Sequence, residues 1–157
     1  MNASPSTPLI IGVGNEFRGD DGVGIVVARR IRARNPANLT IIEASGEGAA
    51  LMEAWKDASL VLLIDATRSG SPPGTIHRFD AHTEPLPGRF FHYSTHAFSV
   101  AEAVELARAL NLLPPRLIVY GIEGKNYTAG EGLSPEVETA GAAVVARVLQ
   151  DAGVSAD

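Results

Sequence analysis

Two adjacent carboxylates stand in a glycine-rich segment near the start of the chain. The segment reads Gly-Val-Gly-Asn-Glu-Phe-Arg-Gly-Asp-Asp-Gly at residues 12–22. The apolar residues 8–11 before it suit a buried strand, and residues 23–31 after it carry apolar side chains at helical spacing. Because ligands of open α/β sheets bind beyond the carboxyl ends of the strands, Asp20 and Asp21 are candidates for a functional site.

The loop does not fit the two common phosphate-binding patterns. A dinucleotide-binding loop needs a third glycine at the position that Phe17 occupies. A P-loop ends in Gly-Lys-Ser/Thr, whereas this loop ends in Gly19-Asp20-Asp21. Two carboxylates would also repel a phosphate group. The residues therefore favour a cation or a proton as the ligand.

Two further side chains are expected at the same edge of the sheet. Asp65 ends the apolar run 60–64, which is typical of a parallel strand covered on both faces. His96 stands just before a helix that a capping box at Ser99 predicts. Two carboxylates and an imidazole suit a borderline metal such as nickel or zinc, with positions left open for water or substrate.

Each of these residues also has a purely structural interpretation. Asp20 or Asp21 could cap the first helix, and for Asp20 we favour the cap. Asp65, taken alone, fits a turn at the end of a strand. His96 could pack against Phe98 as a partly buried polar residue.

Other catalytic patterns around the histidines are weak. His92 and His96 have the four-residue spacing of a helical metal pair, but the glutamate of a zinc protease is absent between them. Ser94 or Ser99 near His96 and Asp65 could imitate a catalytic triad, yet no sequence pattern supports that geometry.

Composition narrows the class of protein. The 157 residues suit a single domain over 1–157, with residues 1–7 expected to be flexible. The net charge of -5 and the absence of a basic stripe argue against nucleic acid or an anionic membrane as partner. The chain has no cysteine, which excludes disulfides, thiol nucleophiles and thiolate metal sites. No signal peptide or membrane span is recognisable, so we expect a cytoplasmic protein.

Strand and helix patterns alternate along the chain and predict an α/β fold. We expect one three-layer domain with a mainly parallel, twisted sheet of about five strands and helices on both faces. The more polar strand is expected at an edge of the sheet. The predicted strands are 8–11, 39–42, 60–64, 75–79 and 117–122, and the predicted helices are 23–31, 47–56, 99–111 and one that starts at 134.

Taken together, the segments resemble the hydrogenase maturation endopeptidases, which process the large subunit of nickel-iron hydrogenases. The resemblance covers essentially the whole chain in the right order. It is carried by Gly-Val-Gly-Asn-Glu-Phe-Arg-Gly-Asp-Asp-Gly-Val-Gly at 12–24, Leu-Ile-Asp-Ala at 63–66, Pro-Pro-Gly-Thr at 72–75, Ser-Thr-His-Ala-Phe-Ser at 94–99, Tyr-Gly-Ile-Glu-Gly at 120–124 and Gly-Leu-Ser-Pro-Glu-Val at 132–137.

The resemblance implies an aspartic-type endopeptidase that removes a C-terminal extension from a nickel-loaded large-subunit precursor. It implies that Asp21, Asp65 and His96 contact the nickel carried by the substrate and take part in catalysis, and that the protease has no tightly bound cofactor of its own. The family often has glutamate where Asp21 stands, so this side chain is one methylene shorter. Gly12, Gly14 and Asn15 are expected to shape the loop, and Glu16 and Arg18 to face the substrate.

Two other functions fit the same residues. A nickel-sensing scaffold would bind the loaded precursor without cutting it. A small-molecule hydrolase on the same fold would turn over its substrate without a protein partner, since fold alone does not fix function.

Overall fold

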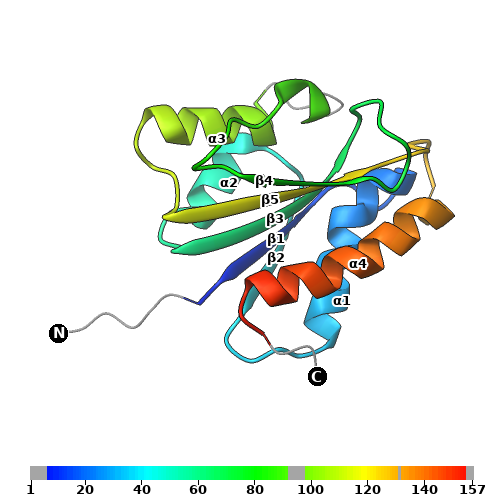
Figure 1. Ribbon diagram of the computed structural model, residues 1–157, viewed down its shortest axis with the longest axis horizontal. Helices are drawn as coiled ribbons and strands as arrows, with labels where there is room; N and C mark the ends of the chain where they lie inside the picture. The colour runs from blue at the N-terminus through cyan, green and yellow to red at the C-terminus, as the bar shows by residue number, and fades with distance from the viewer. Residues whose placement is uncertain (1–6, 92–97, 131, 155–157) are drawn as a thin grey trace.

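The computed structural model describes residues 7–91, 98–130 and 132–154, and shows a sheet between two helical layers (Figure 1). The strands are β1 (Leu9–Val13), β2 (Thr40–Ala44), β3 (Leu60–Thr67), β4 (Ile76–Asp80) and β5 (Arg116–Glu123). The helices are α1 (Val23–Ala33), α2 (Gly48–Trp55), α3 (Val100–Ala109) and α4 (Pro135–Asp151), with 3-10 turns η1 (Gly19–Gly22) and η2 (Gly88–Phe91). The predicted three-layer α/β fold is confirmed.

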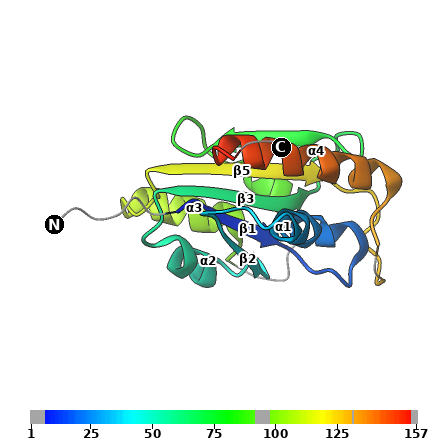
Figure 2. The ribbon, with the colours of Figure 1, turned by 90° about the horizontal axis from the view of Figure 1, so that it is seen from below.

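The five strands form one sheet in the order β2-β1-β3-β5-β4. Neighbouring strands run parallel except β4, which pairs antiparallel with β5. Strand β4 lies at one edge of the sheet, as its polar sequence predicts. Figure 2 shows β5, β3, β1 and β2 side by side in this order. The chain passes from β1 to β2 on one side and then crosses to β3 on the other, so the direction of winding reverses between β1 and β3.

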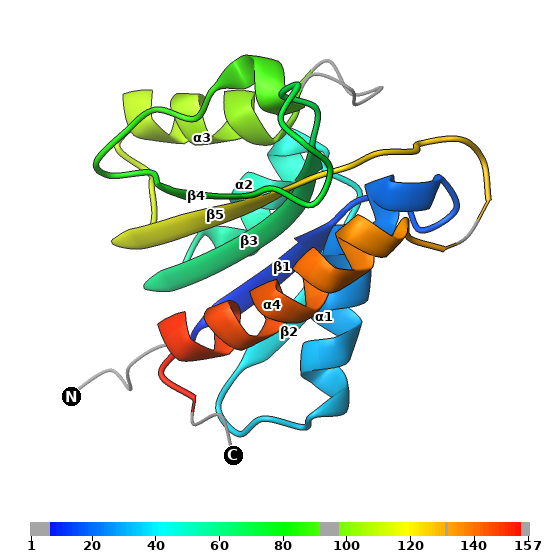
Figure 3. The same cartoon turned by 45° about the vertical axis from the view of Figure 1, so that its right-hand side comes forward.

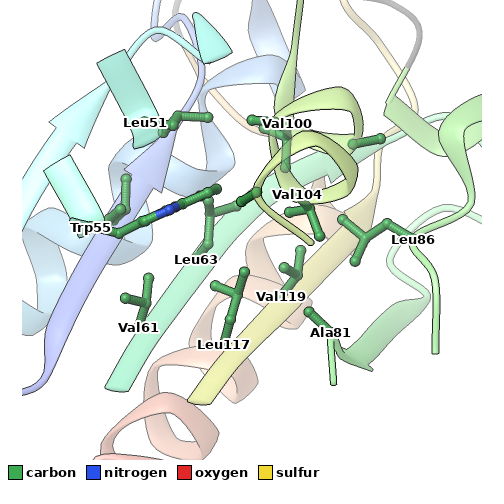
Figure 4. Close-up of a cluster of buried hydrophobic side chains, with 14 of the residues drawn as sticks. Leu51, Trp55, Val61, Leu63, Ala81, Leu86, Val100, Val104, Leu117 and Val119 are labelled. Atoms are coloured by element: carbon green, nitrogen blue, oxygen red, sulfur yellow. The ribbon is translucent and has the colours of Figure 1, made fainter. Parts of the chain in front are cut away.

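The two faces of the sheet carry separate apolar clusters. Helices α2 and α3 cover one face and helices α1 and α4 the other (Figure 3). Successive side chains of a strand point to opposite faces, so Ile11 faces α2 and α3 while Ile10 faces α1 and α4. Figure 4 shows the first cluster, in which Trp55 of α2 and Val104 of α3 lie over Leu63 of β3. Both faces of the sheet are therefore buried under helices, as the apolar strand sequences predict.

Asp65 does not mark the end of its strand, in contrast to the prediction. Strand β3 continues through Asp65 to Thr67, because β5 keeps pairing with it as far as Glu123. The pairing of β3 with β1 stops earlier, at Ile64 and Gly12. Asp65 thus lies in a strand that is hydrogen-bonded on one side and open on the other.

The helices begin close to the predicted positions, but their caps differ. Glu47 caps α2 by accepting from the N–H groups of Ala49 and Ala50, at 3.0 and 2.9 Å. The Ser99 hydroxyl instead donates to Glu102 at 2.6 Å and accepts no hydrogen bond from its helix. The longest helix is α4, with 17 residues. None of the helices in the described part of the chain combines the length and the apolar character that crossing a membrane requires.

Candidate active site

A cleft of about 390 Å³ opens at the carboxyl edge of the sheet, where the winding reverses. Val13 at the end of β1, Ala44 at the end of β2 and Asp65 of β3 all line it. Strand β1 stops at Val13 while β3 runs on, which leaves space beside Asp65. The cleft therefore occupies the position at which open α/β sheets bind ligands.

The structure brings Asp21 and Asp65 to this one cleft. Glu16 and Arg18, the other loop residues that the sequence places toward a substrate, line it as well. Phe17 stands at the same wall with 59% of its surface exposed. The cleft thus combines carboxylates, an arginine and an exposed aromatic ring within one short loop.

Residues 14–22, called here the acidic loop, fold around Asp21. The N–H of Asn15 donates to Oδ2 of Asp21 at 3.0 Å, and the side-chain oxygen of Asn15 accepts from the N–H of Phe17 at 2.9 Å. Gly14 has φ of 148°, and a Cβ there would lie 2.0 Å from the backbone oxygen of Asp21. At Gly12, a Cβ would lie 2.3 Å from the backbone oxygen of Gly24 in α1. Glycine is therefore required at both positions.

One oxygen of the Asp21 carboxylate has no partner among the residues that the structure describes. Oδ1 is buried and makes no hydrogen bond with any residue that the structure describes. Burial raises the pKa of this carboxyl above its ordinary value, although the Asn15 N–H and the charges of Arg18 and Arg68 act in the opposite direction. A buried carboxylate oxygen without a donor calls for a proton or a cation from outside.

Asp65 is almost completely buried, with 3% of its surface exposed. Its Oδ1 accepts from the N–H of the next residue, Ala66, at 2.8 Å. The third predicted site residue, His96, lies outside the described residues, as do His92 and Ser94. Phe91 and Ser99, which flank that segment in the sequence, both line the cleft. Within 7–91, 98–130 and 132–154, no three His, Asp or Glu side chains gather as a metal site.

Asp20 is not the helix cap that we favoured from the sequence. It is fully buried, and its carboxylate accepts from the backbone N–H groups of Lys125, Asn126 and Ser134, at 2.8, 2.9 and 2.7 Å. The Ser134 hydroxyl also donates to it, at 2.8 Å. Burial opposes ionisation, but these hydrogen bonds outweigh it and lower the pKa of Asp20. Asp20 thus ties the acidic loop to the start of α4, and neither acid caps α1.

The backbone repeats this link between the acidic loop and the β5–α4 connection. The N–H of Gly19 donates to the oxygen of Gly130 at 2.8 Å, and the N–H of Gly130 donates to the oxygen of Phe17 at 2.8 Å. The two segments lie side by side beyond the strands (Figures 1 and 3). The position of Asp21 is therefore fixed from two sides.

An arginine in α1 bridges two glutamates, Glu16 and Glu43, at the rim of the cleft. Arg29 donates to both oxygens of Glu16, at 2.6 and 3.1 Å, and to both oxygens of Glu43, at 3.0 and 2.9 Å. Glu43 is the last residue but one of β2 and also lines the cleft. The hydrogen bond from Arg29 is the main reason why the pKa of each glutamate is lowered. Arg29 thus joins the two rim carboxylates, and Arg32 adds a second cation by donating to Glu43 at 2.9 Å.

The sequence did not indicate that three further residues lie at or near the site. Arg68 and Tyr127 line the cleft, and buried Glu123 accepts from Thr67, Ser69 and Gly70 where the chain leaves β3. The position of Arg68, three residues after Asp65, is the signal that could have identified it. No sequence pattern indicates that Tyr127 lies at the cleft, because it belongs to the β5–α4 connection, which is far from Asp21 and Asp65 in the sequence.

Comparison with known proteins gives a consistent result. A family model described as hydrogenase maturation protease matches residues 25–151. A putative hydrogenase maturation protease of Methanocaldococcus jannaschii is 33% identical over 138 residues, which are 84% of this chain and 87% of that protein. The hydrogenase expression/formation protein HupD of Thiocapsa roseopersicina is 26% identical over 88% of this chain, and the match spans 63% of that protein's own length.

The fold has solved counterparts as well. The hydrogenase maturating endopeptidase HybD from E. coli superposes with a TM-score of 0.74 at 20% identity, over 94% of each chain. At this sequence identity, the comparison shows that the two proteins share the α/β fold.

Proposed function

This chain belongs to the hydrogenase maturation protease family, and on that premise we propose that it removes the C-terminal extension of a nickel-loaded large-subunit precursor of a nickel-iron hydrogenase. Membership of the family makes the chain a hydrolase, an endopeptidase of hydrogenase maturation. Beyond family membership, we propose that the enzyme recognises nickel carried by the substrate, and we propose which residues contact that nickel.

The observation that carries the proposal is the pair of carboxylates in one cleft. Asp21 has a buried oxygen without a partner among the described residues, and Asp65 lies in the same cleft on the open side of β3. Carboxylate oxygens, joined by an imidazole, suit nickel with positions left for other ligands. We assign the imidazole to His96. The precursor supplies the nickel together with its remaining ligands.

With His96, the cleft offers nickel three protein ligands, which leaves coordination positions that the loaded precursor fills. A precursor without nickel lacks the ion that these ligands bind, so it docks more weakly. Nickel loading thus becomes a condition for cleavage.

Cleavage needs a water molecule beside the scissile carbonyl carbon. The metal ion lowers the pKa of a bound water, and a cleft carboxylate accepts its proton. The remaining task of the cleft is to hold the extended tail across the carboxyl edge of the sheet. Exposed Phe17 provides an apolar contact there.

The test is the intact mass of the cognate loaded precursor after incubation with the wild-type chain, Asp21→Asn or Asp65→Asn. We expect the wild type to release a C-terminal peptide, and both variants to leave the precursor whole while still folding. A precursor that binds the wild type but keeps its mass would instead identify a scaffold. Turnover of small esters or amides with no cleavage of the precursor would identify a small-molecule hydrolase.

A further inference from the structure

Arg68 places a cation in the cleft that holds Asp21 and Asp65. It follows the last residue of β3, Thr67, and its side chain lines the cleft. The backbone N–H of Arg68 donates to the oxygen of Phe90 at 3.0 Å, which fixes this residue against the turn that carries Phe91. The arginine thus stands three residues beyond Asp65, where the strand leaves the sheet.

An aromatic ring holds the guanidinium in place. The guanidinium carbon of Arg68 lies 3.8 Å from the centroid of the Tyr127 ring, within the range of a cation–π contact. The ring is itself anchored, because the Tyr127 hydroxyl donates to the backbone oxygen of Thr67 at 2.6 Å. Burial is the main reason why the pKa of Tyr127 rises to about 12, so the hydroxyl keeps its proton at neutral pH.

The chain after Arg68 is fixed as well. The N–H groups of Ser69 and Gly70 donate to the Glu123 carboxylate, at 2.8 and 3.2 Å, and the Ser69 hydroxyl donates to it at 2.7 Å. A carboxylate that is 3% exposed and accepts this many hydrogen bonds is a rigid anchor. Hydrogen bonds therefore fix the backbone at Arg68 and at the residues that follow it.

From this placement we infer that Arg68 is a catalytic residue, which donates hydrogen bonds to the scissile carbonyl oxygen as negative charge develops there. The inference rests on the proposed function, because it presupposes peptide cleavage in this cleft. An arginine offers planar N–H donors and keeps its charge, which suits an oxygen that becomes anionic. A donor held in advance costs no reorganisation at the moment of reaction.

The water oxygen bonds to the carbonyl carbon, its proton passes to a carboxylate, and the π electron pair of the C=O bond moves to the oxygen that Arg68 contacts. When that pair returns, the C–N bond breaks and the leaving nitrogen takes up the proton. The second proton of the water leaves the new carboxyl group for the amine, so the products are a carboxylate on the large subunit and an ammonium group on the tail.

The experiment compares Arg68→Ala with Arg89→Ala on the loaded precursor. Arg89 is a matched control: it is exposed and lies 5.6 Å over the ring of Phe90, but it does not line the cleft. We expect Arg68→Ala to lower kcat by about 10²–10³-fold, the usual effect of removing one oxyanion donor, with KM little changed. Arg89→Ala should cut at the wild-type rate. Added guanidinium ion should restore part of the kcat of Arg68→Ala and none of that of Asp21→Asn.

The outcomes separate this inference from the function on which it rests. Wild-type kcat in Arg68→Ala, or a loss confined to KM, would overturn the inference and leave the protease function intact. A loss of kcat that guanidinium does not relieve, joined to a lowered midpoint of thermal unfolding, would assign Arg68 a structural role instead. If the wild type leaves the precursor whole, the proposed function fails and the inference fails with it.

Discussion

The N–H of Asn15 donates to one oxygen of Asp21 at 3.0 Å and leaves the other, Oδ1, buried without a partner among the described residues. The bond orients the carboxylate, and the second oxygen remains available to a ligand. A chain optimised for stability alone would not keep a carboxylate in this state, because burying it unpaired costs free energy. A buried carboxyl with a perturbed pKa in a cleft is a candidate functional residue, which agrees with the role that we propose for Asp21.

We therefore expect Asp21→Asn to be at least as stable as the wild type at neutral pH, although we also expect it to be inactive. Burial raises the pKa of Asp21 in the folded chain, so this group stabilises the fold most below its ordinary pKa of 3.8, and that contribution is lost as pH rises through the raised pKa. Asparagine carries no charge and has no such loss. Urea unfolding at pH 7 measures the difference, and a clear destabilisation of Asp21→Asn would show that the carboxylate is structural.

Asp20→Asn should have the opposite effect on stability. The amide places an NH₂ group where a carboxylate oxygen accepts from backbone N–H groups, so we expect a loss of about 2–3 kcal/mol at pH 7. Hydrogen bonds lower the folded pKa of Asp20, so its stabilisation is present above the ordinary value of 3.8 and is lost as pH falls through the lowered pKa.

The acid side of the unfolding profile should accordingly be flatter in Asp20→Asn than in the wild type. Asp57→Asn, at an exposed turn, is the control for loss of a carboxylate and should be as stable as the wild type at pH 7. Equal stability of Asp20→Asn and the wild type at pH 7 would contradict the anchoring role of Asp20.

Gly14→Ala should lose both stability and processing. Its Cβ would meet the backbone oxygen of Asp21 at 2.0 Å in a backbone conformation that L-residues rarely adopt. We expect a cost of about 1–3 kcal/mol and a displaced Asp21. Gly153→Ala, with φ of 79° but no atom within 4 Å of its Cβ, is the control for the conformational part. If both variants process the precursor at the wild-type rate, the loop does not need Gly14 to position Asp21.

Chelator treatment of the protease alone should leave its activity unchanged. If the nickel belongs to the precursor, wild-type chain that is incubated with EDTA and then desalted should cut loaded precursor at its original rate. Loss of activity that added zinc or nickel restores before the precursor is present would identify a resident metal instead.

Much of the fold could be predicted because its signals are local. The apolar runs and the helical spacing of residues 23–31 fix the elements, and a β-α-β alternation then leaves little choice of sheet. The same logic predicts that Asp21 and Asp65 share an edge, because parallel strands end together. It could not predict that β3 continues past Asp65, since that depends on pairing with β5 rather than on the residues of β3.

The role of Asp20 and the contact between Arg68 and Tyr127 could not be predicted from the sequence, for a related physical reason. The carboxylate of Asp20 is satisfied by N–H groups more than 100 positions away, at Lys125, Asn126 and Ser134. Capping preference is a local rule, and here a long-range contact overrides it. Tyr127 meets Arg68 for the same reason, because the β5–α4 connection folds back over the end of β3.

We propose that the acids of this cleft recognise nickel that the substrate carries. The most direct measurement is the intact mass of one precursor preparation, divided into nickel-loaded and nickel-free halves, after incubation with chelator-treated wild-type chain. We predict that only the loaded half loses its C-terminal peptide. Equal cleavage of both halves would contradict the claim and leave Asp21 and Asp65 as ordinary acid–base groups of a protease that does not sense the metal.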